Sequence, residues 1–225
     1  MVVMFLKNGI EYGIFTINTI NDTSTYWKRP MRNRIILTDV DGVLLDWEYA
    51  FDVYLQQHGF NKVPGGNLKY DIGKRYGIDY EQGRKLIKIF NESAHIGFLP
   101  PLRDAMYYVK RLHEEHGYVF HAITSLSRDE NACELRRMNL RKLFGATAFE
   151  KFVFLDTGAD KDEALEPYRN SGYFWVEDKI VNCQVGRDLG LKSLLMEHGH
   201  NMDYQDPEIP RVTSWREIYQ TVVNE

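Results

Sequence analysis

Short apolar runs alternate with helix-like patterns along most of the chain. The apolar runs are predicted to be buried strands, and they cover residues 34–38, 118–124, 151–155, 173–176 and 192–196. The intervening stretches with helical spacing are residues 103–115, 128–143, 161–168, 180–189 and 214–223. This alternation predicts an α/β fold, a doubly wound, Rossmann-like and mostly parallel sheet with helices on both faces.

One segment interrupts the alternation directly after the first predicted strand. Residues 47–100 are too long for an ordinary connection in such a sheet, and their first part, residues 47–60, has a helical pattern. We therefore expect a small, mainly helical cap over 47–100, inserted into a core made of 34–46 and 101–225. Residues 1–33 contain a possible hairpin and are predicted to be an N-terminal extension.

Composition excludes several classes of protein. A net charge of −4 argues against bulk binding of nucleic acid, so we expect no stable nucleic-acid partner. Cys133 and Cys183 can neither form a disulfide framework nor complete a four-ligand zinc site alone. No apolar run approaches the ~18 residues of a membrane span and no signal peptide is recognisable, so we expect a cytoplasmic protein without a membrane partner. His198 and His200 lack acidic or cysteine partners at useful spacing and are predicted to lie in a surface loop.

Reactive side chains follow four of the predicted strands. They are Asp39, Asp41 and Gly42 after 34–38, Thr124 and Ser125 after 118–124, Lys161 after 151–155, and Glu177 and Asp178 after 173–176. Each alone is typical of a turn, a helix cap or a solvated surface. Ligands of open α/β sheets bind beyond the carboxyl ends of the strands, so the four together predict one site.

The chemistry of these side chains favours a phosphate ester and a hard metal ion. Carboxylates crowded at one rim raise each other's pKa, and a divalent cation between them removes the repulsion. Oxygen ligands with few histidines indicate Mg²⁺ rather than zinc. Thr124, Lys161 and backbone N–H groups could hold the phosphoryl oxygens. Asp39 and Asp41, separated by one residue, suit a nucleophile and an acid/base pair.

These motifs resemble those of the haloacid dehalogenase superfamily of phosphohydrolases. The first motif is DVDGVLLD at 39–46, followed by the strand ending at Thr124, then Lys161, then VED at 176–178. The resemblance implies that Asp39 becomes an aspartyl-phosphate and that Asp41 protonates the leaving oxygen and then activates water. It further implies phosphate binding by Thr124, Ser125, Lys161 and Gly42, and Mg²⁺ binding by Asp39, the Asp41 carbonyl and Asp178. Glu177 replaces the more frequent Asp, which leaves open how Glu177 and Asp178 share the metal.

A narrower resemblance connects the chain with the 5′(3′)-deoxyribonucleotidases. It is carried by DVDGVLLDWE, FLPPLRDAMYYVKRL, the Thr-Ser pair and RVTSWREIY. It implies substrate contacts from Trp47, Tyr70 and Phe90 in the cap, although Asp71 stands where that family has a tryptophan. The alternative, favoured for most of the cap aromatics, is that they form the cap's own core, whereas Trp47 fits either role.

The sequence therefore predicts a magnesium-dependent phosphomonoester hydrolase that acts through an aspartyl-phosphate. The expected substrate is a small phosphorylated molecule, most of all a nucleoside or deoxynucleoside monophosphate, as for a 5′-nucleotidase. One alternative is a phosphatase for a sugar phosphate or for a nucleic-acid end. The non-enzyme alternative is a degenerate member of the superfamily that serves as an interaction module.

Overall fold

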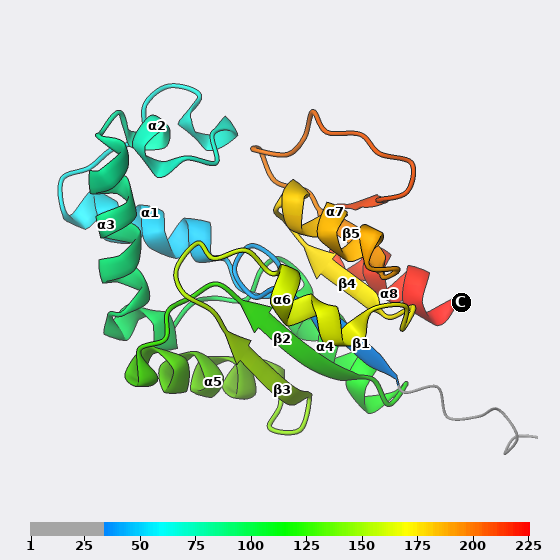
Figure 1. The fold of residues 1–225 in the computed structure, drawn as a ribbon. Coiled ribbons are helices and arrows are strands. Elements are labelled where there is room, and N and C mark those ends of the chain that lie inside the picture. Colours follow the sequence, from blue (N-terminus) through cyan, green and yellow to red (C-terminus); the bar gives the residue numbers. More distant parts are fainter. Residues whose placement is uncertain (1–33) are drawn as a thin grey trace, which may run out of the picture. The chain divides into compact units, whose positions relative to one another are not determined.

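A six-stranded parallel sheet lies at the centre of the part of the chain that the structure describes, residues 34–225 of a computed structural model (Figure 1). The possible hairpin lies outside the described residues. The strands are β1 (Ile35–Thr38), β2 (Val119–Thr124), β3 (Phe149–Phe154), β4 (Phe174–Glu177), β5 (Lys192–Met196) and β6 (Arg211–Val212). Their order is β3-β2-β1-β4-β5-β6, and each neighbouring pair is parallel. The predicted α/β class is confirmed; β6, with only two residues, was too short to leave a sequence pattern.

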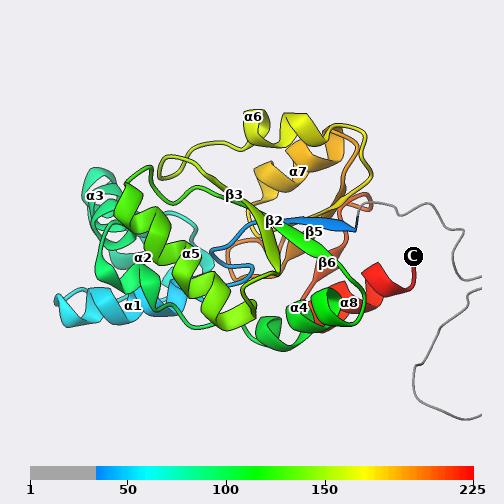
Figure 2. The same cartoon turned by 90° about the horizontal axis from the view of Figure 1, so that it is seen from below.

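Helices cover both faces of this sheet, as the alternation predicted. Helices α4 (Ala105–Glu114), α5 (Glu130–Phe144) and α8 (Trp215–Val223) lie on one face, and α6 (Asp162–Leu165) and α7 (Ile180–Asp188) lie on the other (Figure 2). A short 3₁₀ helix, η4 (Glu166–Tyr168), follows α6, with Pro167 near its start. Alternate strand residues enter two separate apolar clusters, one containing Ile36 and Phe120 and the other containing Leu37 and Trp175.

The residues between β1 and α4 are mostly helical. We call residues 47–100 the helical segment; it contains α1 (Trp47–Gln57), η2 (Gly66–Leu68), α2 (Ile72–Tyr76), α3 (Tyr80–Asn91) and η3 (Ala94–Gly97). Aromatic rings hold these helices together, with the Phe51 ring 4.5 Å from Trp47 and 5.2 Å from Phe90 between centroids. The segment lies beyond the carboxyl ends of β1 and β2 (Figure 1).

No helix within residues 34–225 is long and apolar enough to cross a membrane.

Candidate active site

The turn after β1 places two aspartates at the rim of the sheet. The backbone N–H of Asp39 donates to the carbonyl of Val176 in β4 at 2.9 Å, which attaches the turn to the neighbouring strand. Gly42 closes the turn with a φ of +75°, a conformation that favours glycine. A Cβ at Gly42 would also lie only 2.6 Å from the Asp178 carboxylate, so this position leaves no room for a side chain.

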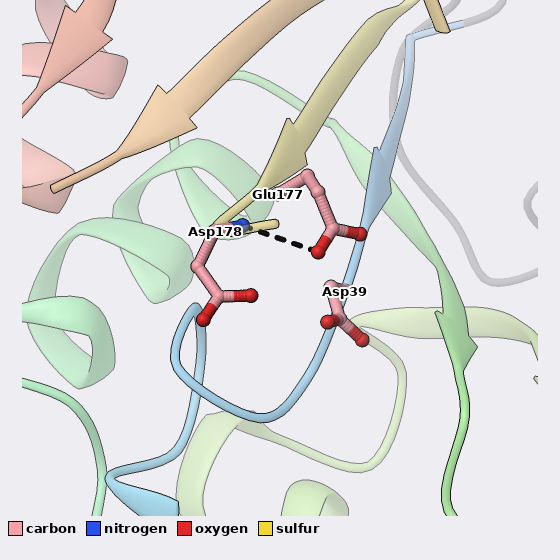
Figure 3. Close-up of side chains that lie close together, drawn as sticks. All are labelled: Asp39, Glu177 and Asp178. Atoms are coloured by element: carbon pink, nitrogen blue, oxygen red, sulfur yellow. Dashed lines mark hydrogen bonds between the residues drawn. The ribbon is translucent and has the colours of Figure 1, made fainter. Parts of the chain in front are cut away.

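Three carboxylates from β1 and β4 converge at this rim (Figure 3). One oxygen from each of Asp39, Glu177 and Asp178 lies within 4.8 Å of the others. Burial and the charge of Glu177 raise the pKa of Asp39 to about 7. Burial and the charge of Asp39 raise the pKa of Asp178 to about 7 as well. Such a group needs cations close by if all three acids are to be ionised.

Lys161 supplies one of these cations from the start of α6. Its Nζ lies 2.8 Å from Asp39 Oδ1 and 2.7 Å from Glu177 Oε2, and the lysine is 1% exposed. Burial alone would lower the pKa of Lys161, but the two carboxylates raise it above its usual value. This lysine is therefore charged inside the protein, beside the proposed nucleophile.

Glu177 and Asp178 differ in how their oxygens are used. Glu177 Oε2 accepts from Lys161, and Oε1 accepts from the backbone N–H groups of Lys179 at 3.0 Å and Asp178 at 3.2 Å. Both oxygens of Glu177 are thus engaged with the protein, whereas the Asp178 carboxylate faces Asp39 across the turn (Figure 3). The geometry favours Asp178 as the acid available to a metal ion.

Asp41 pairs with a buried arginine that the sequence reasoning missed. Arg136 of α5 is fully buried; its Nη1 donates to Asp41 Oδ1, and its Nη2 donates to Oδ2 at 3.3 Å. The Asp41 side chain therefore lies with Arg136 and not in the three-acid group, and the metal contact expected of Asp41 is the one through its backbone carbonyl. Arg136 follows no strand, so the strand-end pattern could not indicate it.

Thr124 and Ser125 differ although they are adjacent. Thr124 is 1% exposed, and its Oγ1 has no hydrogen-bond partner within the described structure. A buried hydroxyl of this kind costs free energy unless a ligand satisfies it. Ser125 instead donates its hydroxyl hydrogen bond to the carbonyl of Ala159 at 2.8 Å.

A cavity of about 430 Å³ connects the rim with the helical segment. Trp47 and Tyr70, for which the resemblance implies substrate contacts, both line it, and Trp47 Nε1 also donates to Asn91 Oδ1 at 2.9 Å. Phe90 is fully buried between Phe51 and Tyr54 and does not line the cavity. The expectation that Phe90 contacts a substrate is corrected, because its ring belongs to the core of the helical segment.

Two histidines line the same cavity; they lie in a loop, between β5 and β6, as expected, but their side chains face the cavity. His198 Nε2 lies 2.6 Å from the carbonyl oxygen of Gly42, and the His200 side chain is 8% exposed. Burial lowers the pKa of His198, and it lowers that of His200 to about 4, so both rings are neutral at pH 7. Their sequence signal was only the spacing His-Gly-His.

Comparison with known proteins gives one sequence relative and several structural neighbours. No family model matches the chain. The chain is 32% identical over 193 residues to the uncharacterized 32.4 kDa protein in the Gp30-rIII intergenic region of Enterobacteria phage T4, covering 81% of this chain and 67% of that protein.

The structural neighbours share one fold. A haloacid dehalogenase-like family hydrolase from Streptococcus pneumoniae has a TM-score of 0.57 at 14% identity, covering 84% of this chain and 98% of that one. The D,D-heptose 1,7-bisphosphate phosphatase of B. bronchiseptica, complexed with magnesium and phosphate, has a TM-score of 0.54 at 11% identity. The match covers 85% of this chain and 98% of that one. CbbY from Rhodobacter sphaeroides in complex with phosphate has a TM-score of 0.53 at 16% identity, and the match covers 82% of this chain and 96% of that one. The chain therefore belongs to the family of the phage T4 protein, and its fold is that of the haloacid dehalogenase-like hydrolases.

Proposed function

We propose that the protein hydrolyses phosphomonoesters through an aspartyl-phosphate on Asp39. The observation that carries the proposal is the buried pair of Asp39 and Lys161, together with the unpartnered hydroxyl of Thr124, which lines the same cavity as Asp39. A carboxylate can attack phosphorus, a cation can neutralise the phosphoryl charge, and a free hydroxyl can donate a hydrogen bond to a phosphoryl oxygen. In this proposal the helical segment is the cap of the catalytic core formed by 34–46 and 101–225.

The acidic group fits Mg²⁺ as the cofactor. Its donors are carboxylate oxygens, the hard ligands that Mg²⁺ prefers, and burial together with the charge of a neighbouring acid raises the pKa of Asp39 and of Asp178, which a cation would offset. Asp39 and Asp178 would hold the ion, together with the Asp41 carbonyl implied by the resemblance. When bound, Mg²⁺ would neutralise charge on the acids and on the phosphoryl oxygens. The heptose bisphosphate phosphatase with the same fold is itself complexed with magnesium and phosphate.

The side chains of the rim can carry two proton-balanced steps. An oxygen of Asp39 attacks phosphorus, the bond from phosphorus to the substrate oxygen breaks, and protonated Asp41 gives its proton to that oxygen to release an alcohol. Asp41, now a carboxylate held in place by Arg136, takes a proton from water. The water oxygen bonds to phosphorus, the acyl-phosphate bond breaks, and inorganic phosphate and free Asp39 remain. Lys161 favours the charged form of Asp39 and neutralises the phosphoryl group, to which Thr124 donates a hydrogen bond.

The proposed substrate is a nucleoside 5′- or 3′-monophosphate, with deoxynucleotides preferred. The cavity volume of about 430 Å³ lies in the range of small-molecule sites, and Trp47 and Tyr70 offer aromatic surface to a base. Asp71 also lines the cavity, where the resemblance would place a tryptophan, so base contacts there are polar.

A second candidate substrate is a phosphate at the end of a nucleic-acid strand. A neighbouring cavity of about 510 Å³ shares Arg84 and Thr157 with the first and is also lined by Lys85 and Lys88. A strand longer than one nucleotide could extend into it, with its next phosphate near these cations. The acids Glu81, Glu92 and Asp156 line the same cavity and weaken this attraction.

Phosphate release from a panel of monophosphates tests the proposal. The panel contains nucleoside 5′- and 3′-monophosphates, sugar phosphates and short 5′- or 3′-phosphorylated oligonucleotides, each with Mg²⁺ and with chelator. We expect turnover to need Mg²⁺ and to fall about 1,000-fold or more in Asp39→Asn, with the exposed Asp203→Asn as the matched control. Full activity in Asp39→Asn, or indifference to chelator, contradicts the mechanism. Inactivity across the panel despite bound Mg²⁺ favours the interaction module instead.

A further inference from the structure

The turn His198–Asn201, which we call the docking turn, is tied to both catalytic loops of the core. Asn201 is 1% exposed, and its Nδ2 donates to the carbonyls of Asp178 and Met196, each at 2.8 Å. His198 Nε2 reaches the carbonyl of Gly42 at 2.6 Å. The turn therefore supports the backbone that carries the acid Asp178 and the backbone that carries Asp39 and Asp41.

The other side of the docking turn contacts the helical segment. A Cβ at Gly199 would lie 2.5 Å from the backbone oxygen of Asn67 and 3.4 Å from Leu68 Cδ2, so η2 packs directly on this glycine. The rings of Tyr70 and His200 meet edge to face with centroids 5.1 Å apart. The loop between β5 and β6 reaches towards the end of the helical segment that carries η2 and α2 (Figure 1).

This contact is shallow compared with the attachment at α1 and α3. Leu68 and Tyr70 remain 50% and 58% exposed, whereas Phe51 and Phe90 are fully buried in the main apolar cluster. The buried area at η2 is thus small, and hydrophobic stabilisation grows with buried area. The structure combines an extensively buried attachment at α1 and α3 with a small, partly exposed contact at the docking turn, across the cavity from α3.

We propose that the docking turn sets the closed position of the helical segment and couples it to the geometry of Asp178 and of the Asp39–Gly42 turn. Gly199 and Asn201 are positioning residues in this arrangement: Gly199 admits the Asn67 backbone, and Asn201 holds the Asp178 carbonyl. Closure of the helical segment thereby changes the positions of the acids Asp39 and Asp178 through the docking turn. The kinetic and Mg²⁺-binding parts of this inference rest on the proposed function, whereas the position of the helical segment does not.

Gly199→Ala is the direct test, because the new methyl group would meet a backbone oxygen and not a flexible side-chain end. Spin labels on the exposed positions Gln82 and Asp203, each replaced by cysteine, report the distance between α3 and the β5–β6 loop. Cys133 and Cys183 are buried and their thiol pKa values are raised, so both label poorly. We expect a longer or broader distance distribution in Gly199→Ala than in the labelled parent. An unchanged distribution overturns the proposal.

Gly145→Ala is the matched control. Gly145 has a φ of +108° and open space around its Cβ position, so alanine strains the backbone there without touching the helical segment. We expect it to lower stability while leaving the label distance and the steady-state kinetics as in the parent. A shift of the same size in both variants shows a general effect of destabilisation and contradicts the assignment of Gly199.

Asn201→Ala tests the coupling to the acidic group. Loss of a side chain that orients a metal ligand typically weakens metal binding, and here we expect the calorimetric Kd for Mg²⁺ to rise about tenfold. Gly199→Ala is expected to lower kcat/KM about 10- to 100-fold through misplacement of the substrate. Unchanged Mg²⁺ affinity in a folded Asn201→Ala protein contradicts the coupling. The label and calorimetric results decide the proposal even if no phosphatase activity is found.

Discussion

At the scale of single residues, the adjacent acids Glu177 and Asp178 have different surroundings. Glu177 is fully buried with Lys161 and two backbone N–H donors, and burial raises its pKa above the usual value. Asp178 faces Asp39, and its carboxylate lies beside Gly42. In the proposed mechanism these positions suit Glu177 to hold Lys161 and Asp178 to bind the metal ion.

Exchanging each acid for its amide separates the two roles. We expect Asp178→Asn to raise the Kd for Mg²⁺ about 100-fold, because it removes a charged ligand oxygen. We expect Glu177→Gln to change that Kd little but to lower the free energy of unfolding by about 3 kcal/mol, because Lys161 loses one of its two buried carboxylate partners. Titration calorimetry and urea unfolding measure the two effects. The reverse pattern would reassign the ligand to Glu177.

At the scale of elements, aromatic packing joins α1 to α3. Phe90 of α3 meets Phe51 and Tyr54 of α1 at centroid distances of 5.2 Å. Trp47 extends the same stack towards the cavity, so it serves the core on one side and the cavity on the other. This double use explains why the sequence favoured neither role for Trp47.

Phe90→Ala tests the role of this ring in holding the helical segment. Removing a fully buried phenylalanine ring leaves a cavity, and we expect a loss of about 3–5 kcal/mol in the free energy of unfolding. The neighbouring Ile89→Ala is the control, since Ile89 is 45% exposed and its loss should cost roughly 0.5 kcal/mol or less. Denaturant unfolding measures both. Equal losses in the two variants would contradict the assignment of Phe90 to the core.

At the scale of the whole molecule, stability is linked to pH and to metal through the buried acids. The pKa values of Asp39 and Asp178 are raised from 3.8 to about 7 on folding, so the folded protein binds protons more tightly than the unfolded chain. Their contribution to stability is therefore fully present below about pH 4 and is lost as the pH rises through 7. Burial of the charged carboxylates and their mutual repulsion cause this loss, and a bound cation would offset both.

Mg²⁺ is accordingly expected to stabilise the protein more at pH 8 than at pH 5.5. A ligand present at 100 times its Kd raises the free energy of unfolding by about 2.7 kcal/mol. For a chain of this size this raises Tm by roughly 5–10 °C. At pH 5.5 protons compete for Asp39 and Asp178, so the shift should be smaller. Thermal unfolding with Mg²⁺ and with chelator measures it, and Asp178→Asn should show little shift at either pH. A larger shift at pH 5.5 would contradict the linkage.

The sheet was predictable from the sequence because a buried parallel strand is a local pattern of apolar, β-branched residues between turns. Runs such as 34–38 and 118–124 could be recognised without knowing their neighbours. The reactive side chains at the rim were predictable once the strands were recognised, because the carboxyl ends of parallel strands share one edge of the sheet. Asp39, Thr124, Lys161 and Asp178 line or lie beside the cavity at that edge.

The contacts of each side chain needed the tertiary structure, because they join residues far apart in the chain. Arg136 reaches Asp41 across 95 positions, and His198 reaches Gly42 across 156. No local sequence pattern marks Arg136 or His198 as a contact of the rim. An arginine on a helix or a histidine in a loop is usually solvated. The sequence alone therefore determined the sheet and the set of reactive groups at its edge. Only the packing of the helices and of the β5–β6 loop decided which of those groups face a ligand and which serve to position the others.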